Sequence, residues 1–167
     1  MSPNILTVTT ATDREIIMTR VFNAPRRLVF EACTRCEHMK HWFGPRGWTL
    51  PECKIDFRAG GAWRWVLSGP GGRKMGMNGV FQEIAAPELF VTTESFDDYP
   101  GESLNTLTFI EQDGKTTLTV RVVYESAAIR DAVLKSGMQR GAGEAYDRLA
   151  EHLETMAQET SGEYREK

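Results

Sequence analysis

Cysteine and histidine side chains gather near the start of the sequence at a spacing that could hold a metal. Cys33, Cys36, His38 and His41 lie within nine residues, and thiolate and imidazole are ligand types that zinc prefers. Structural zinc sites, however, use two ligand pairs separated by a longer loop, so that four groups can converge. We therefore expect no metal and no other cofactor. Cys36, beside Arg35 near a helix start, has the setting of a reactive thiol.

Charged side chains inside apolar strands are the second candidate for chemistry. Asp56, Glu94 and Arg121 each lie one or two residues from large apolar side chains. Such a group must be paired if it points inward, because a lone buried charge is costly, and it could then orient a ligand or act as an acid or base. Strict alternation along a strand places the neighbours of inward residues in solvent instead. The sequence assigns no catalytic residue.

Small side chains open a long predicted C-terminal helix, where a filled core would carry Leu or Phe. Gly141, Ala142 and Ala145 leave volume that a facing sheet rich in aromatic and Met side chains could enclose, which suits an apolar ligand. The alternative is that these residues simply pack, and the pattern does not fix which strand parity faces the helix. The candidate ligand-binding residues are Trp42, Trp63, Trp65, Met77, Phe81, Glu94, Phe96, Phe109, Arg121, Tyr124, Met138, Ala142 and Tyr146.

Turn residues and alternating hydrophobicity define the strands that must position these side chains. A first strand is predicted over residues 13–22, with an extension back to residue 5. Successive hairpins then predict a meander, giving about seven antiparallel strands in all. The six later strands are expected at about 49–58, 62–68, 75–85, 89–97, 104–112 and 116–125.

Helical spacing predicts two short helices after the first strand, a third over residues 127–135, and a long C-terminal helix over about 137–157. Thr34, Ser126 and Ser136 stand where N-caps are expected. The long helix would span roughly 30 Å, enough to cover the apolar face of the sheet. This is an α+β plan.

Length and charge limit the class of protein further. The chain has 167 residues and a formal charge of −3, which predicts one domain over residues 1–158 and a polar, disordered tail over 159–167. Without a dense Lys/Arg cluster or a long apolar run, we expect no nucleic acid and no membrane as partner, and a cytoplasmic location. Three cysteines are too few for a disulfide framework, so reduced thiols are expected. An exposed edge strand would permit a homodimer.

Several strings resemble a known family. They are W-F-G-P at 42–45, D-F-R-A-G-G-A-W at 56–63, G-V-F at 79–81 and D-R-L-A at 147–150. Together with the order of elements over about residues 13–157, they resemble the SRPBCC (START-like, helix-grip) superfamily, in its branch named after the activator of the ninety-kilodalton heat-shock protein ATPase. The resemblance implies a helix-grip fold with a pocket between the sheet and the long helix, and a bacterial-type stress role.

Three functions stay open. The first is binding of a small hydrophobic or amphipathic molecule in that pocket, with Arg121 or Glu94 as a polar contact. The second is a cyclase- or hydrolase-like enzyme that uses the same space, since some members of the superfamily catalyse such reactions. The third is stimulation of a chaperone ATPase, which the branch name implies by analogy of fold alone.

Overall fold

The computed structural model describes residues 5–165, with side chains as far as Glu159. Its strands are β1 (Thr7–Thr9), β2 (Glu15–Phe22), β3 (Thr49–Ile55), β4 (Ala62–Ser68), β5 (Lys74–Ala85), β6 (Leu89–Phe96), β7 (Glu102–Gln112) and β8 (Lys115–Val123). Its helices are α1 (Arg26–Thr34), α2 (Cys36–Trp42), α3 (Ala127–Lys135) and α4 (Met138–Arg165), with a short 3-10 turn at Pro70–Gly72.

The strands form one antiparallel sheet in the order β1-β2-β8-β7-β6-β5-β4-β3. The predicted meander from β3 to β8 is confirmed. The predicted first strand is two strands, β1 and β2, so the sheet has eight strands instead of about seven. β2 pairs with β8 and not with β3, because α1 and α2 carry the chain from β2 to the opposite edge before the meander begins.

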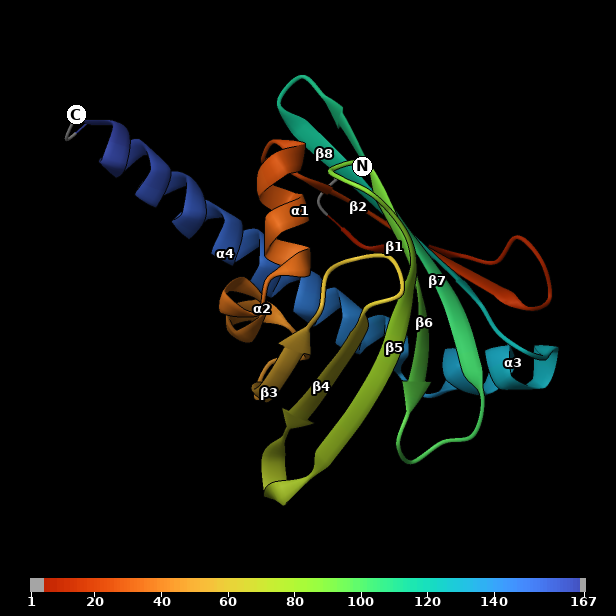
Figure 1. Cartoon of the computed structure of the whole chain (residues 1–167). Coiled ribbons are helices and arrows are strands. Elements are labelled where there is room, and N and C mark those ends of the chain that lie inside the picture. The colour runs from red at the N-terminus through yellow and green to blue at the C-terminus, as the bar shows by residue number, and fades with distance from the viewer. Residues whose placement is uncertain (1–4, 166–167) are drawn as a thin grey trace.

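The helices α1, α2 and α4 lie on one side of the curved sheet, and α4 runs obliquely past it (Figure 1). Each strand alternates, so one face of the sheet is apolar and needs this cover. The arrangement is the α+β helix-grip fold that the sequence predicted. No helix in the described part of the chain is long and apolar enough to cross a membrane.

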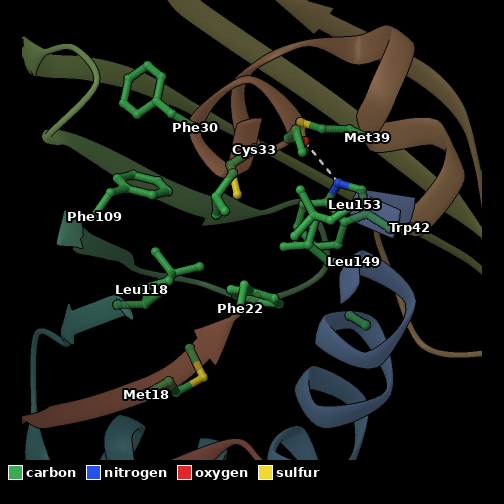
Figure 2. Packing of buried hydrophobic residues seen from close by; sticks show 14 of the residues in the cluster. Met18, Phe22, Phe30, Cys33, Met39, Trp42, Phe109, Leu118, Leu149 and Leu153 are labelled. Carbon is green, nitrogen blue, oxygen red and sulfur yellow. Dashed lines mark hydrogen bonds between the residues drawn. The ribbon is translucent and has the colours of Figure 1, made fainter. Parts of the chain in front are cut away.

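One end of the interior is tightly packed (Figure 2). We call it the packed end. Its side chains come from the end of β2, the start of β6, the end of β7, the start of β8, α1 and the middle of α4, and each is at most 7% exposed. Full burial of an apolar side chain of this size contributes roughly 1.5–3 kcal/mol. The packed end consists of Phe22, Phe30, Phe90, Phe109, Leu118 and Leu149.

Two of the recognised strings hold α4 in place by contacting each other. Arg148, from the D-R-L-A string, donates hydrogen bonds from Nη1 to the carbonyls of Gly44 and Pro45 at 2.8 and 3.1 Å. Its neighbour Asp147 accepts a 2.6 Å bond from Arg20, a buried cation on the inner face of β2 that the sequence analysis missed. The middle of α4 is therefore fixed to both the W-F-G-P loop and the sheet.

The predicted caps are partly right. Ser126 caps α3, with its hydroxyl accepting a backbone N–H of the first turn. Thr34 and Ser136 are not N-caps: their hydroxyls donate back to the carbonyls of Phe30 and Val133 at the ends of the preceding helices. A short polar side chain can bond in either direction, and the local pattern does not distinguish the two.

Helix α4 is longer than predicted. It continues through residues 159–165, where the sequence analysis placed a disordered tail. Each further residue of an existing helix adds one backbone hydrogen bond without a new nucleation cost. The rest of the predicted tail, residues 166–167, lies outside the described residues.

A disulfide joins Cys36, the first residue of α2, to Cys53 of β3. The expectation of reduced thiols, and of a reactive thiol at Cys36, is wrong for this pair. The odd number of cysteines gave no indication of a disulfide. The fold packs β3 close to α2, and the Cα atoms of Cys36 and Cys53 are therefore 5.7 Å apart. Cys33 is free and buried, and burial raises the pKa of its thiol to about 12.

Candidate functional site

The inner face of the sheet is incompletely covered where β6 and β8 end and α4 begins. Large apolar and aromatic side chains there are only half-buried, although they lie on the same face as the packed end. We call this region the open end. Its half-buried residues are Trp65, Phe96, Tyr124, Met138, Ala142 and Tyr146.

Polar side chains interrupt the apolar inner face at the open end. Glu94 of β6 is paired in register with Ser103 of β7. The Ser103 hydroxyl donates to Asn105 Oδ1 at 3.1 Å, which leaves the amide N–H groups of Asn105 to donate to the Glu94 carboxylate. Ser103 and Asn105 are both buried. Three polar groups therefore form a connected set under the start of α4.

The surroundings of the Glu94 carboxyl change its pKa. Burial raises its pKa to about 7, against a smaller opposing effect of the hydrogen bond from Asn105. Burial, and then the nearby Glu94 charge, also raise the pKa of the Tyr124 hydroxyl above its ordinary value. At neutral pH the Glu94 carboxyl is thus divided between its acid and its ionised form, so it can donate or accept a hydrogen bond.

Two tryptophans line the same wall from β4. Their rings lie 4.1 Å apart. The indole N–H of Trp63 donates to Thr92 Oγ1 at 2.7 Å. The indole nitrogen of Trp65 is buried and has no hydrogen-bond partner. The phenyl ring of Phe43, the residue that follows α2, packs on Trp65 at 4.7 Å.

The structure brings most of the predicted ligand-binding residues to this region. Glu94 lies in the same region as the six half-buried residues named above. Met77 lies between Trp65 and Phe96 in the strand register. Trp63 borders them through its ring contact with Trp65. Trp42 stacks on Tyr146 at 6.0 Å, and its indole N–H is already bonded to Ala32 O.

Three predicted residues do not belong to the site. Arg121 lies on the outer face and pairs with Glu15, because Val120 and Val122 on either side of it are buried. Assigning Arg121 as a polar contact is therefore wrong. Phe81 and Phe109 contact other phenylalanines toward the packed end.

The sequence analysis missed Ser103, Asn105 and Phe43. A signal for the first two was present, since they alternate with outward residues along β7 in phase with Phe109. Extending that period of two back along the strand would have placed both on the inner face. Phe43 had no such signal, because it acts from a loop.

The three histidines of the chain meet where α2 packs against α4. His38 Nδ1 and His152 Nε2 are 3.1 Å apart, and His41 stacks on His152 with ring centroids 5.0 Å apart. Two of them border a surface hollow of about 310 Å³, which is lined by His41, Arg148, Glu151, His152, Thr155 and Glu159. Within the described residues, no group of three or more potential ligand side chains is arranged to hold a metal ion.

Comparisons with known proteins define the class and then the family. A sequence model for the family described as Activator of Hsp90 ATPase homolog 1-like protein matches residues 23–154. A crystal structure of a protein from Rhodobacter sphaeroides is 30% identical over 90% of this chain and 99% of its own, with a TM-score of 0.86. Protein Ms6760 from Mycobacterium smegmatis is 26% identical over 90% of this chain and 99% of its own, with a TM-score of 0.81.

CalU16 from Micromonospora echinospora shares the fold alone, at 22% identity over 95% of this chain and 89% of its own, with a TM-score of 0.59. No curated protein matches the chain. The helix-grip fold and these likenesses define a protein of the SRPBCC superfamily. Within it, the chain belongs to the Activator of Hsp90 ATPase homolog 1-like family.

Proposed function

We propose that the protein binds a small amphipathic molecule at the open end, between the inner face of the sheet and the start of α4. One observation carries the proposal: a connected polar set, Glu94, Asn105 and Ser103, lies among half-buried aromatic and Met side chains. Binding sites for small molecules combine an apolar lining with a few placed polar groups in this way.

The alternative for such side chains is packing for stability, and their burial argues against it. Residues that serve only the core are best buried completely, as Leu118 and Leu149 are at 1% and 0% exposure. Trp65, Phe96 and Tyr146 keep part of their surface exposed. A raised carboxyl pKa costs stability that an apolar residue at position 94 would not cost, which favours a role in recognition.

A dye-binding titration on the full chain tests the proposal. N-phenyl-1-naphthylamine fluoresces in apolar surroundings, and we expect saturable binding at one site. Ala142→Leu adds a branched side chain at the open end and should weaken binding at least tenfold. Ala157→Leu makes the same change at an exposed position farther along α4 and should leave binding unchanged.

Native mass spectrometry of freshly purified protein complements the titration. A retained small molecule that is lost in Ala142→Leu but kept in Ala157→Leu would support the site. Dye binding that is absent, or equal in all three proteins, would contradict it.

An enzymatic use of the same site is a second candidate, favoured by the pKa of Glu94. A general acid or base works best with a pKa near the working pH. Burial raises the pKa of the Glu94 carboxyl to about 7. Glu94→Gln keeps the shape and removes the titration. If the site is catalytic, this variant should still bind the retained molecule but no longer convert it. Equal conversion by both proteins would exclude Glu94 as the acid or base.

A further inference from the structure

The indole N–H of Trp65 is an unused hydrogen-bond donor at the open end. Its nitrogen is buried without a partner, whereas the N–H of Trp63, two residues earlier on the same face of β4, is bonded to Thr92. A buried donor that lacks an acceptor loses its bonds to water and gains nothing in exchange. An acceptor atom of a ligand placed at this N–H would restore the hydrogen bond that burial has removed.

Building on the proposed function, we infer that the ligand carries an acceptor oxygen that takes the hydrogen bond of Trp65, at the end of the molecule opposite to the group held by Glu94. The class is a molecule with an apolar middle and an acceptor oxygen, of the carbonyl or ether kind, at the β4 end.

The strand register supports this layout. Trp65 pairs with Met77, and Met77 pairs with Phe96 on the next strand. Glu94 is the next residue on the inner face of β6 after Phe96. With strands about 4.8 Å apart and same-face residues about 6.7 Å apart, the backbones at Trp65 and Glu94 are separated by roughly 12 Å. Between the two polar groups the wall is apolar, which matches an apolar middle.

Access to the N–H requires a small movement of side chains. Phe43 covers the Trp65 ring from the loop after α2 and is itself only half-buried. Met77 borders the ring from the neighbouring strand, and its unbranched side chain adapts readily to a new neighbour. The ligand oxygen would enter by displacing one of these two side chains.

A pair of matched competitors tests the inference. Displacement of N-phenyl-1-naphthylamine is measured with 2-acetylnaphthalene and with 2-ethylnaphthalene, which are similar in size but differ in the carbonyl oxygen. The readout is the ratio of their two dissociation constants in wild type, Trp65→Phe and Trp63→Phe. Loss of one hydrogen bond should reduce the preference for the ketone about five- to tenfold in Trp65→Phe. In Trp63→Phe the ratio should stay as in wild type, because that N–H is already bonded to protein.

The outcomes separate this inference from the proposed function. An unchanged ratio in Trp65→Phe, or an equal fall in both variants, overturns the inference while dye binding still stands. Failure of every compound to bind wild type overturns the proposed function itself. If a variant does not fold, indole N–H signals of labelled wild-type protein give the same answer. One such signal should move downfield with 2-acetylnaphthalene and not with 2-ethylnaphthalene, and equal shifts with both would overturn the inference.

Discussion

The packed end and the open end of the interior share one sheet face and one helix but differ in how they are filled. At the packed end, Phe22, Phe109 and Leu118 from the sheet meet Leu149 of α4, and none is more than 1% exposed. At the open end, Trp65 and Phe96 face the start of the same helix and remain half-buried. Side chains at the packed end are withdrawn from solvent, whereas aromatic side chains at the open end keep part of their surface exposed.

The two halves of α4 account for this difference. Its middle presents Leu149, Leu153 and Met156, all at most 4% exposed, to the sheet and to α1 and α2. Its first turns present Ala142 and Tyr146, which are half-buried. One helix can cover a closely packed and a less closely packed part of the same sheet, because each of its turns faces a different part of that sheet.

The largest expected effect is the loss of a large side chain at the packed end. Leu149→Ala should lower the free energy of unfolding by about 3 kcal/mol, because it removes buried methyl groups and leaves a cavity. Met138→Ala at the open end should cost less than about 1 kcal/mol, since the side chain is already partly in solvent. Urea unfolding of both variants measures the difference. Equal losses would remove the distinction between the two ends.

The disulfide should matter almost as much, and its effect should concentrate at the open end. Cys36 and Cys53 are 17 residues apart in sequence, and a closed loop of this length is expected to contribute about 3 kcal/mol by limiting the unfolded chain. Cys53 pairs in register with Trp65. The double variant Cys36→Ser, Cys53→Ser should therefore unfold more easily, with faster amide exchange in α2 and β3 than in β7 and β8.

Chemical reduction provides the control for that variant. A dithiol reagent should reproduce the loss in wild type and change nothing in the double variant. Uniformly faster exchange over the whole sheet would contradict a local tether.

Local pattern predicted the strands and helices better than it predicted their long-range pairing. Period-two hydrophobicity and turn residues located β3 to β8, and helical spacing placed Leu149 on the inner stripe, because these signals depend only on near neighbours. The pairing of β2 with β8 and the bond between Cys36 and Cys53 depend on where α1 and α2 carry the chain. No local pattern encodes that path.

The polar residues of the site show a second limit. Glu94 and Arg121 both stand beside apolar residues in the sequence, yet Glu94 lies on the inner face and Arg121 on the outer one. The difference depends only on which alternate residues of each strand face inward. A bulge, such as the register shift between Phe81 and Glu83, reverses that alternation along a strand, and the sequence pattern does not show where it occurs. Asn105 and Ser103 became recognisable as a set only when β6 and β7 were paired.

An intermediate effect is expected from Glu94, and it should depend on pH. The folded pKa of about 7 lies above the value of about 4.3 usual for an unfolded chain, so the fold favours the protonated form. Its contribution to stability is full below about pH 4.3 and is lost as the pH rises through 7. Glu94→Gln, which stays neutral, should therefore be more stable than wild type by roughly 1–2 kcal/mol at pH 8 and equal to it at pH 4.

Thermal or urea unfolding across this pH range measures the gain. Glu154→Gln, at an exposed position on α4, should show no such trend. An equal response of both variants would mean that the open end imposes no cost on its carboxyl.

The smallest expected effect has the opposite sign and lies outside the open end. Burial, and then the neighbouring charges of His38 and His41, lower the pKa of His152, with Glu159 opposing them. The fold thus favours neutral His152. The contribution of this residue to the stability of the folded state is full above about pH 6.5 and is lost as the pH falls through the folded pKa. Because the ring is only partly buried, the free energy of unfolding of wild type should fall by under about 1 kcal/mol relative to that of His152→Gln between pH 7.5 and 5.

The two groups have opposite effects on the pH dependence of stability. Glu94, at the open end, lowers the stability of the protein as the pH rises, whereas His152, where α2 meets α4, lowers it as the pH falls. The double variant should therefore show a flatter dependence than either single one between pH 5 and 8, and a dependence as steep as in wild type would show that neither group sets it.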